Sequence, residues 1–140
     1  MEMLYVGERF ETRIRLSQAE VEEFRRFSGD SNPIHDDIEG AERSAIGREA
    51  VRSVHGMHVA LVFTRILGTQ FPGAGTVYRS LMLEFDEPVL VDTEYIAEVS
   101  VLSVDRKRHR ARVLTLIREA TEPEKTNVFG IGLVIHKERI

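Results

Sequence analysis

The stretch MHVALVFTRILGTQ, residues 57–70, decides the fold, because it is the longest apolar segment with helical spacing. One side of such a helix carries Met57, Ala60, Leu61, Thr64 and Leu67, and the other carries Val59, Val62, Phe63 and Ile66. A helix that is apolar nearly all round is predicted to be buried in the core. Phe71-Pro72-Gly73 follows and is predicted to end the helix.

Downstream of this helix the apolar residues recur at every second position, which is typical of β-strands. Four strands are predicted, over Thr76–Phe85, Glu94–Val104, Arg108–Glu119 and Thr126–His136. Asp105-Arg106-Lys107 is predicted to form a hairpin turn. Gly130 and Gly132 share one face of the last strand, where we expect a close approach of backbone or ligand.

Upstream of the helix, Glu8–Leu16 alternates and predicts a further strand. Ser17 and Glu20 form an S-x-x-E capping box, which indicates the start of a second helix. One face of that helix is apolar, with Val21, Phe24 and Phe27. Residues 36–54 are polar, and a short helix near residues 38–45 is expected within them.

The predicted elements therefore run strand, helix, polar loop, apolar helix and four strands. One antiparallel sheet wrapped around one long buried helix satisfies this order, so the predicted fold class is α+β. A length of 140 residues favours a single domain over residues 1–140, which is large enough to bury a core without disulfides.

The composition excludes several functional classes. The chain has 19 Lys and Arg against 23 Asp and Glu residues, and this mildly acidic balance argues against nucleic-acid binding. The absence of Cys excludes disulfides, thiolate nucleophiles and Cys-based zinc sites. We find neither a signal-peptide pattern at the start nor an apolar stretch of membrane-spanning length, so a cytoplasmic protein without a membrane partner is expected.

The stretch FSGDSNPIH, residues 27–35, places Asp30, Asn32 and His35 within six residues. Asp and His are well suited to move protons near neutral pH, provided that burial tunes the carboxylate. Asn32 can donate and accept hydrogen bonds, so it can hold the loop or a ligand. From the residues alone an ordinary turn is favoured over an active site, because Asp, Asn and Pro are common turn formers.

The same stretch is similar to the signature of the MaoC-like, hydratase-2 family, which runs aromatic, small, Gly, Asp, any, Asn, Pro, aliphatic, His. The fixed positions are matched by Phe27, Ser28, Gly29, Asp30, Asn32, Pro33, Ile34 and His35. His55-Gly56-Met57 forms a second matching block, and Leu67–Gly73 forms a third. The resemblance spans residues 7–138 and changes the interpretation of the loop from a turn to an active site.

The resemblance implies a hot-dog fold, a homodimer, and acyl thioesters of coenzyme A or acyl carrier protein bound near the subunit interface. The implied activity is the reversible hydration of a trans-2-enoyl thioester to an (R)-3-hydroxyacyl thioester, that of an (R)-specific enoyl-CoA hydratase. Asp30 and His35 are then expected to act on the water and the α-carbon, and Asn32 to support the site. Neither a cofactor nor a metal is expected.

The resemblance also assigns roles to the apolar helix. The backbone amide of Gly56 is expected to bind the thioester oxygen, the hydroxyl of Thr64 to contact the catalytic carboxylate, and Met57 to support substrate binding. Elementary physics agrees on Gly56, because a helix N-terminus offers free N–H groups and a positive dipole end. An oxyanion donor of this kind contributes about 2.7–4 kcal/mol. Thr64 lies about two turns further along much the same face.

Three features depart from the family pattern or admit another interpretation. The charged segment Asp36–Val54 is a few residues longer than in compact members, which leaves the acyl-chain preference open. His58 replaces an aliphatic residue and lies on one helix face with His55. Without a third ligand, polar packing or an interface contact is favoured over a metal, and His55 is expected to cap or anchor the helix start. Arg106–Arg110 could meet coenzyme A phosphates, although a solvated turn is favoured.

Two other functions stay open. A hot-dog thioesterase would also use a carboxylate and a polarising helix N-terminus, but the D-x-N-P-x-H loop and the His-Gly-Met block favour hydration. A non-catalytic acyl-thioester-binding subunit would bind the substrate without turnover. The joint presence of the loop, Gly56 and Thr64 argues against it, because an idle site needs none of them.

Overall fold

The computed structural model describes residues 1–140 and contains one five-stranded antiparallel sheet. The strands are β1 (Arg9–Arg15), β2 (Val77–Phe85), β3 (Glu94–Asp105), β4 (Arg110–Glu119) and β5 (Thr126–Ile135), and their spatial order is β1-β3-β4-β5-β2. All five predicted strands are therefore confirmed, with ends shifted by at most two residues. A four-residue turn, 106–109, joins β3 to β4 where the hairpin was predicted.

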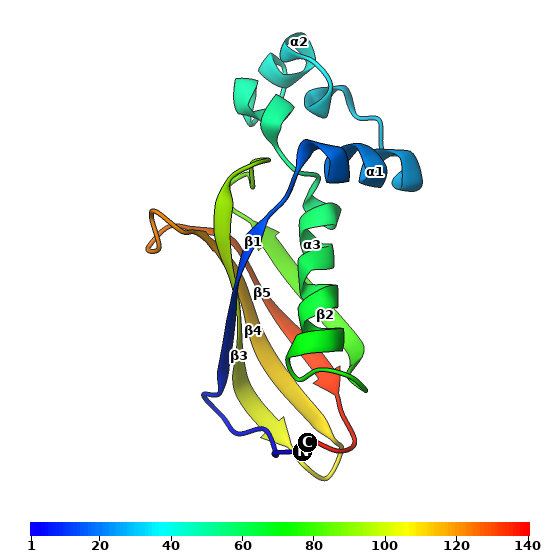
Figure 1. Cartoon of the computed structure of the whole chain (residues 1–140), viewed down its shortest axis with the longest axis vertical. Helices are drawn as coiled ribbons and strands as arrows, with labels where there is room; N and C mark the ends of the chain where they lie inside the picture. The colour runs from blue at the N-terminus through cyan, green and yellow to red at the C-terminus, as the bar shows by residue number, and fades with distance from the viewer.

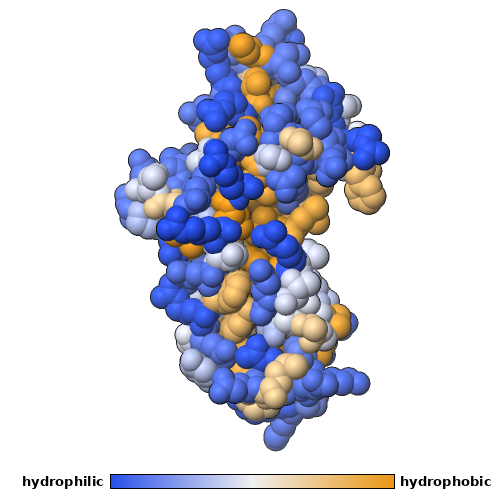
Figure 2. Space-filling model, viewed as in Figure 1, coloured by the Kyte–Doolittle hydropathy of each residue, from blue (hydrophilic) through white to orange (hydrophobic).

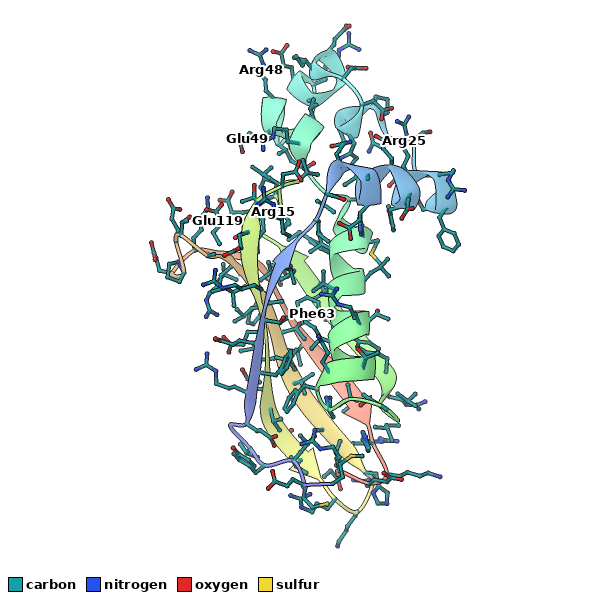
Figure 3. The ribbon with its side chains drawn as sticks, viewed as in Figure 1. Arg15, Arg25, Arg48, Glu49, Phe63 and Glu119 are labelled. Carbon is teal, nitrogen blue, oxygen red and sulfur yellow. The ribbon has the colours of Figure 1, made fainter.

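The apolar helix α3 (Gly56–Arg65) continues into a π-helical segment η3 (Ile66–Gln70) and lies along the inner face of the sheet (Figure 1). Phe63 projects from α3 toward the strands and is fully buried (Figure 3). Around it the core collects the inward residues of β3 and β4, among them Tyr95, Val99 and Val113. The predicted α+β class, with a sheet wrapped around this helix, is confirmed.

The helix α3 is not buried all round, and this part of the prediction is wrong for the single chain. Met57 is 68% exposed and Leu61 is 51% exposed. The reason is geometric: the curved sheet covers one side of the helix, and no other element covers the face that carries Met57 and Leu61 (Figure 1). Apolar atoms accordingly reach the surface where α3 meets the helices above it (Figure 2).

The two glycines of β5 allow the sheet to close tightly, as predicted. A Cβ atom at Gly130 would lie 2.1 Å from the carbonyl oxygen of Met82 in the neighbouring β2. One at Gly132 would lie 3.2 Å from the Val113 side chain in β4. Both glycines thus allow a close approach of the neighbouring strands β2 and β4.

The segment between β1 and α3 forms four short helices above one end of the sheet (Figure 1). They are α1 (Gln18–Ser28), η1 (Pro33–His35), α2 (Ile38–Glu42) and η2 (Gly47–Arg52). The capping box at the start of α1 is present, with Ser17 and Glu20 hydrogen-bonded in both directions. The apolar face of α1 is shorter than predicted, because Val21 is buried whereas Phe27 is 92% exposed.

The helices of the protein are all too short or too polar to span a lipid bilayer.

Candidate active site

The loop after α1 is built by side chains that each accept a hydrogen bond from an amide two residues ahead. Ser28 Oγ accepts from the Asp30 amide, Asp30 Oδ1 from the Asn32 amide, and Asn32 Oδ1 from the Ile34 amide, at 3.1–3.3 Å. Gly29, with φ of 73°, ends the helix in the left-handed conformation that glycine accommodates readily. The turn chemistry and the acid–base motif are therefore properties of the same side chains.

An ion pair fixes this loop to α1. The guanidinium of Arg25, labelled in Figure 3, contacts both carboxylate oxygens of Asp36 at 2.7 and 2.8 Å. Such a bidentate pair restricts orientation as well as distance. Since Asp36 directly follows η1, the pair holds the residue next to His35 against the helix that precedes Asp30.

His35 has one ring nitrogen committed to the protein and one left free. Its Nδ1 lies 3.2 Å from the Ser53 carbonyl oxygen and 3.1 Å from Ser53 Oγ. The Ser53 hydroxyl donates its only proton to the Ala50 carbonyl at 2.6 Å, so Oγ can only accept from Nδ1. Nδ1 therefore carries the proton of the neutral ring, and Nε2 keeps its lone pair.

The pKa of His35 is lowered from its usual value of 6.5. Burial is the main cause, and the neighbouring His55 adds to the effect. A neutral imidazole with a free Nε2 is the form that accepts a proton from water. The sequence could not indicate Ser53, because the residue that selects this tautomer lies 18 positions away in the polar segment.

His55 is a site residue that sequence reasoning assigned to another role. It is the N-cap residue of α3, but its side chain makes no capping hydrogen bond. Its ring instead packs against the ring of His35, with 3.9 Å between the centroids and 32° between the ring planes, and its Nε2 lies 4.0 Å from Asp30 Oδ2. The presence of His directly before Gly56 in the second matching block was the available signal.

Asp30 and His35 both lie beside the ring of His55, but they form no hydrogen bond with each other. The side chain of Asp30 is 47% exposed, so the burial expected of this carboxylate is not present in the single chain. Asn32 lies between them in sequence and supports the pair structurally, because its side chain caps the short helix that carries His35.

A cavity of about 230 Å³ opens beside this cluster, and both His35 and Gly56 line it. Gly56 is the first residue of α3, so its N–H has no partner within the helix. A Cβ at this position would lie 3.4 Å from the ring of Phe85, on the opposite wall. The remaining wall is mostly apolar and includes Ile46, from the long polar segment, and Val59.

Thr64 and Met57 lie on a different groove of about 220 Å³, between α3 and the edge strand β2. Tyr78 and Arg79 form its other side. Asp30, Asn32, His35 and Gly56 thus gather at the N-terminal end of α3, whereas Thr64 is not brought to the carboxylate within one chain. The roles assigned to Met57 and Thr64 stay predictions.

His58 and the basic run Arg106–Arg110 lie apart from the cavity that His35 and Gly56 line. His58 is buried and stacks on Phe24 with 5.0 Å between ring centroids, which fits the predicted polar packing. We find no group of three or more His, Asp or Glu side chains placed to hold a metal ion. The turn after β3, which carries the basic run, lies at the end of the sheet where β2 begins at Val77. Gly56 lies beside Phe85, at the opposite end of β2.

Fold and site together define a class of protein: a hot-dog domain that presents an Asp-x-Asn-Pro-x-His loop at the N-terminus of its central helix. The family model described as "MaoC like domain" matches residues 5–122, and the chain belongs to this family.

Curated relatives and solved structures agree with that assignment. The chain is 38% identical to the (R)-specific enoyl-CoA hydratase of Aeromonas caviae, over 81% of this chain and 83% of that protein. It is 36% identical to the 3-hydroxybutyryl-CoA dehydratase of Methylorubrum extorquens over 70% of this chain, but the match spans only 60% of that relative. The solved (R)-hydratase of Aeromonas caviae superposes with a TM-score of 0.82, at 34% identity, over 95% of this chain and 97% of that one.

Proposed function

We propose that this protein is a hydro-lyase that reversibly adds water to a trans-2-enoyl thioester and gives an (R)-3-hydroxyacyl thioester. The observation that carries the proposal is the shared cavity: the imidazole of His35, with its free Nε2, and the start of α3 at Gly56 line the same space. One group can activate water while the other binds an oxygen that becomes negative. The names of the relatives support the same substrate class and the R configuration.

In the proposed reaction His35 Nε2 takes a proton from a water molecule as the water oxygen bonds to C3. The electron pair of the C2–C3 double bond moves toward the thioester, and charge develops on its carbonyl oxygen. The Gly56 N–H and the positive end of α3 stabilise that charge. The imidazolium of His35 then delivers a proton to C2, so water is added and the neutral imidazole is restored.

Asp30 contributes in two ways in this scheme. Its Oδ2 accepts a hydrogen bond from the attacking water, while Oδ1 is held by the Asn32 amide. Its negative charge also favours the imidazolium form of His35 that exists during the reaction. In this scheme Asp30 acts as a hydrogen-bond acceptor and a fixed charge, and His35 carries the proton.

We further propose that two copies associate through the face that carries Met57 and Leu61. The exposed apolar residues of α3 and the unpaired edge of β2 lie on either side of the second groove. An exposed sheet edge beside apolar side chains favours pairing with another chain. A partner here would also enclose Thr64, which one chain leaves open.

The proposal is tested by mixing the purified protein with crotonyl-coenzyme A and following both the enoyl absorbance and free thiol. We expect the absorbance to fall without release of thiol, and a stereospecific dehydrogenase to identify the product as the R alcohol. Release of thiol would favour a thioesterase. Binding without turnover across acyl lengths, with both coenzyme A and acyl carrier protein as carriers, would favour a non-catalytic subunit.

A further inference from the structure

The least explained group at this site is the side chain of His55. It is only 2% exposed, yet neither Nδ1 nor Nε2 has a hydrogen-bond partner. A buried polar atom without a partner destabilises a fold, and most proteins avoid it. We propose that His55 is a positioning residue for Asp30, whose carboxylate it holds by an Nε2–H hydrogen bond when substrate occupies the cavity.

The geometry supports this role for His55. Its Nε2 lies 4.0 Å from Asp30 Oδ2, about one ångström beyond hydrogen-bond length. Asp30 is on a partly exposed loop, so a small shift of its side chain closes the gap. Hydrogen bonds at active sites are often long before substrate binds and shorten in the complex.

The packing around His55 fixes its ring while leaving its nitrogens free. The ring packs at a tilt against His35, with 3.9 Å between the ring centroids, and lies 5.2 Å from the ring of Phe24. The ring of His55 therefore contacts His35, the proposed base, and lies beside the carboxylate of Asp30. A rigid donor in this position would set the distance between Asp30 and the water that His35 activates.

The neighbouring His58 does not share this position. It is also buried on α3, also packs on Phe24, and also has an unpartnered Nδ1. His58 forms no ion pair with Asp30; the carboxylate that acts on its ring is Glu20, which lies with it on a separate groove. His58 is therefore a matched control for burial, helix and aromatic neighbour, and it differs in facing no catalytic group.

The experiment compares His55→Phe with His58→Phe in the hydration of crotonyl-coenzyme A, and so rests on the proposed function. Each change keeps a flat ring and removes both nitrogens, so the melting temperature should stay level or rise in both variants. We expect His55→Phe to lower kcat by about 10- to 100-fold with little change in KM, the loss expected for one hydrogen bond to a charged group. His58→Phe should keep wild-type kcat.

A double variant separates positioning from a structural effect. If His55 acts through Asp30, adding His55→Phe to Asp30→Asn should reduce kcat no further than Asp30→Asn alone. Additive losses would overturn the inference. If His55→Phe does not fold, His55→Gln and His55→Met decide the question, because they match in length and only Gln retains a donor; equal rates would again overturn it.

The two proposals fail in different ways. Full activity of folded His55→Phe beside an active wild type would overturn the role of His55 and leave the hydratase function intact. A wild-type protein that hydrates no enoyl thioester would contradict the proposed function and this inference with it.

Discussion

Single residues of this site serve the fold and the chemistry together. Asp30 and Asn32 accept the hydrogen bonds that shape the loop; Asp30 is also a proposed catalytic group, and Asn32 caps the short helix that carries His35. Ser53 acts from a distance, because its hydroxyl and carbonyl oxygens both accept from His35 and so determine which ring nitrogen is free. At this scale a turn and an active site are not alternatives.

Buried histidines make stability depend on pH. Burial lowers the pKa of both His35 and His58 below the usual 6.5. As the pH falls below about 6.5, the unfolded chain therefore binds more protons than the folded protein. The free energy of unfolding decreases in that range. We expect the free energy of unfolding, measured in urea, to decrease between about pH 7.5 and pH 5.5.

The variant His58→Phe isolates part of that dependence. It removes one of the two shifted groups, so its free energy of unfolding should decrease less over the same pH interval. A slope equal to that of wild type would show that His58 is not protonated with a lowered pKa. The same lowered pKa of His35 predicts that catalysis persists at pH 6.5 and declines below it.

Site residues could be predicted from the sequence where they lie together in one short motif. Asp30, Asn32 and His35 fall within one short motif, so one stretch of sequence identifies them. The ring contact between His55 and His35 and the hydrogen bonds of Ser53 join segments that lie about 20 residues apart. Such contacts depend on how helices pack, and no local pattern contains that information.

Among the elements, strands were predicted most closely. Alternation of buried and exposed residues is a direct consequence of strand geometry, so β1 to β5 could be located to within two residues. The exposure of α3 could not be predicted in the same way. An apolar residue on a helix indicates that the face will be covered, but it does not indicate whether the same chain or a partner covers it.

The start of α3 is the element-scale feature that the proposed chemistry needs most. In Gly56→Ala a methyl group would point toward the ring of Phe85 across the cavity, at 3.4 Å. The helix tolerates Ala, so the melting temperature should change little. The methyl group would displace the thioester oxygen from the Gly56 amide by about 1 Å. We expect this displacement to lower kcat/KM by up to about 100-fold.

Steady-state kinetics with crotonyl-coenzyme A check the Gly56→Ala prediction, with Gly68→Ala as a control. Gly68 lies in η3, the π-helical continuation of α3, and a Cβ there would meet no atom within 4 Å. Equal kcat/KM values for Gly56→Ala and wild type would contradict the assignment of the Gly56 amide to the thioester oxygen.

At the scale of the whole molecule, the exposed face of α3 predicts an assembly. Leu61 is 51% exposed at the centre of this face, beside the groove that α3 forms with β2. A charge buried there without a partner would prevent association, so Leu61→Arg should elute as a monomer. Light scattering coupled to size-exclusion chromatography measures the change against wild type, which we expect to be a dimer, and a wild type that is monomeric at all concentrations would contradict the prediction.

The most direct test of the account is the rate of crotonyl-coenzyme A hydration by wild type, Asp30→Asn and His35→Gln. We expect wild type to turn over, and each variant to lose about 100-fold or more in kcat while keeping its melting temperature, as expected for acid–base groups. His109→Gln, at the opposite end of the sheet, serves as a control and should match wild type. Wild-type rates in either Asp30→Asn or His35→Gln would contradict the account.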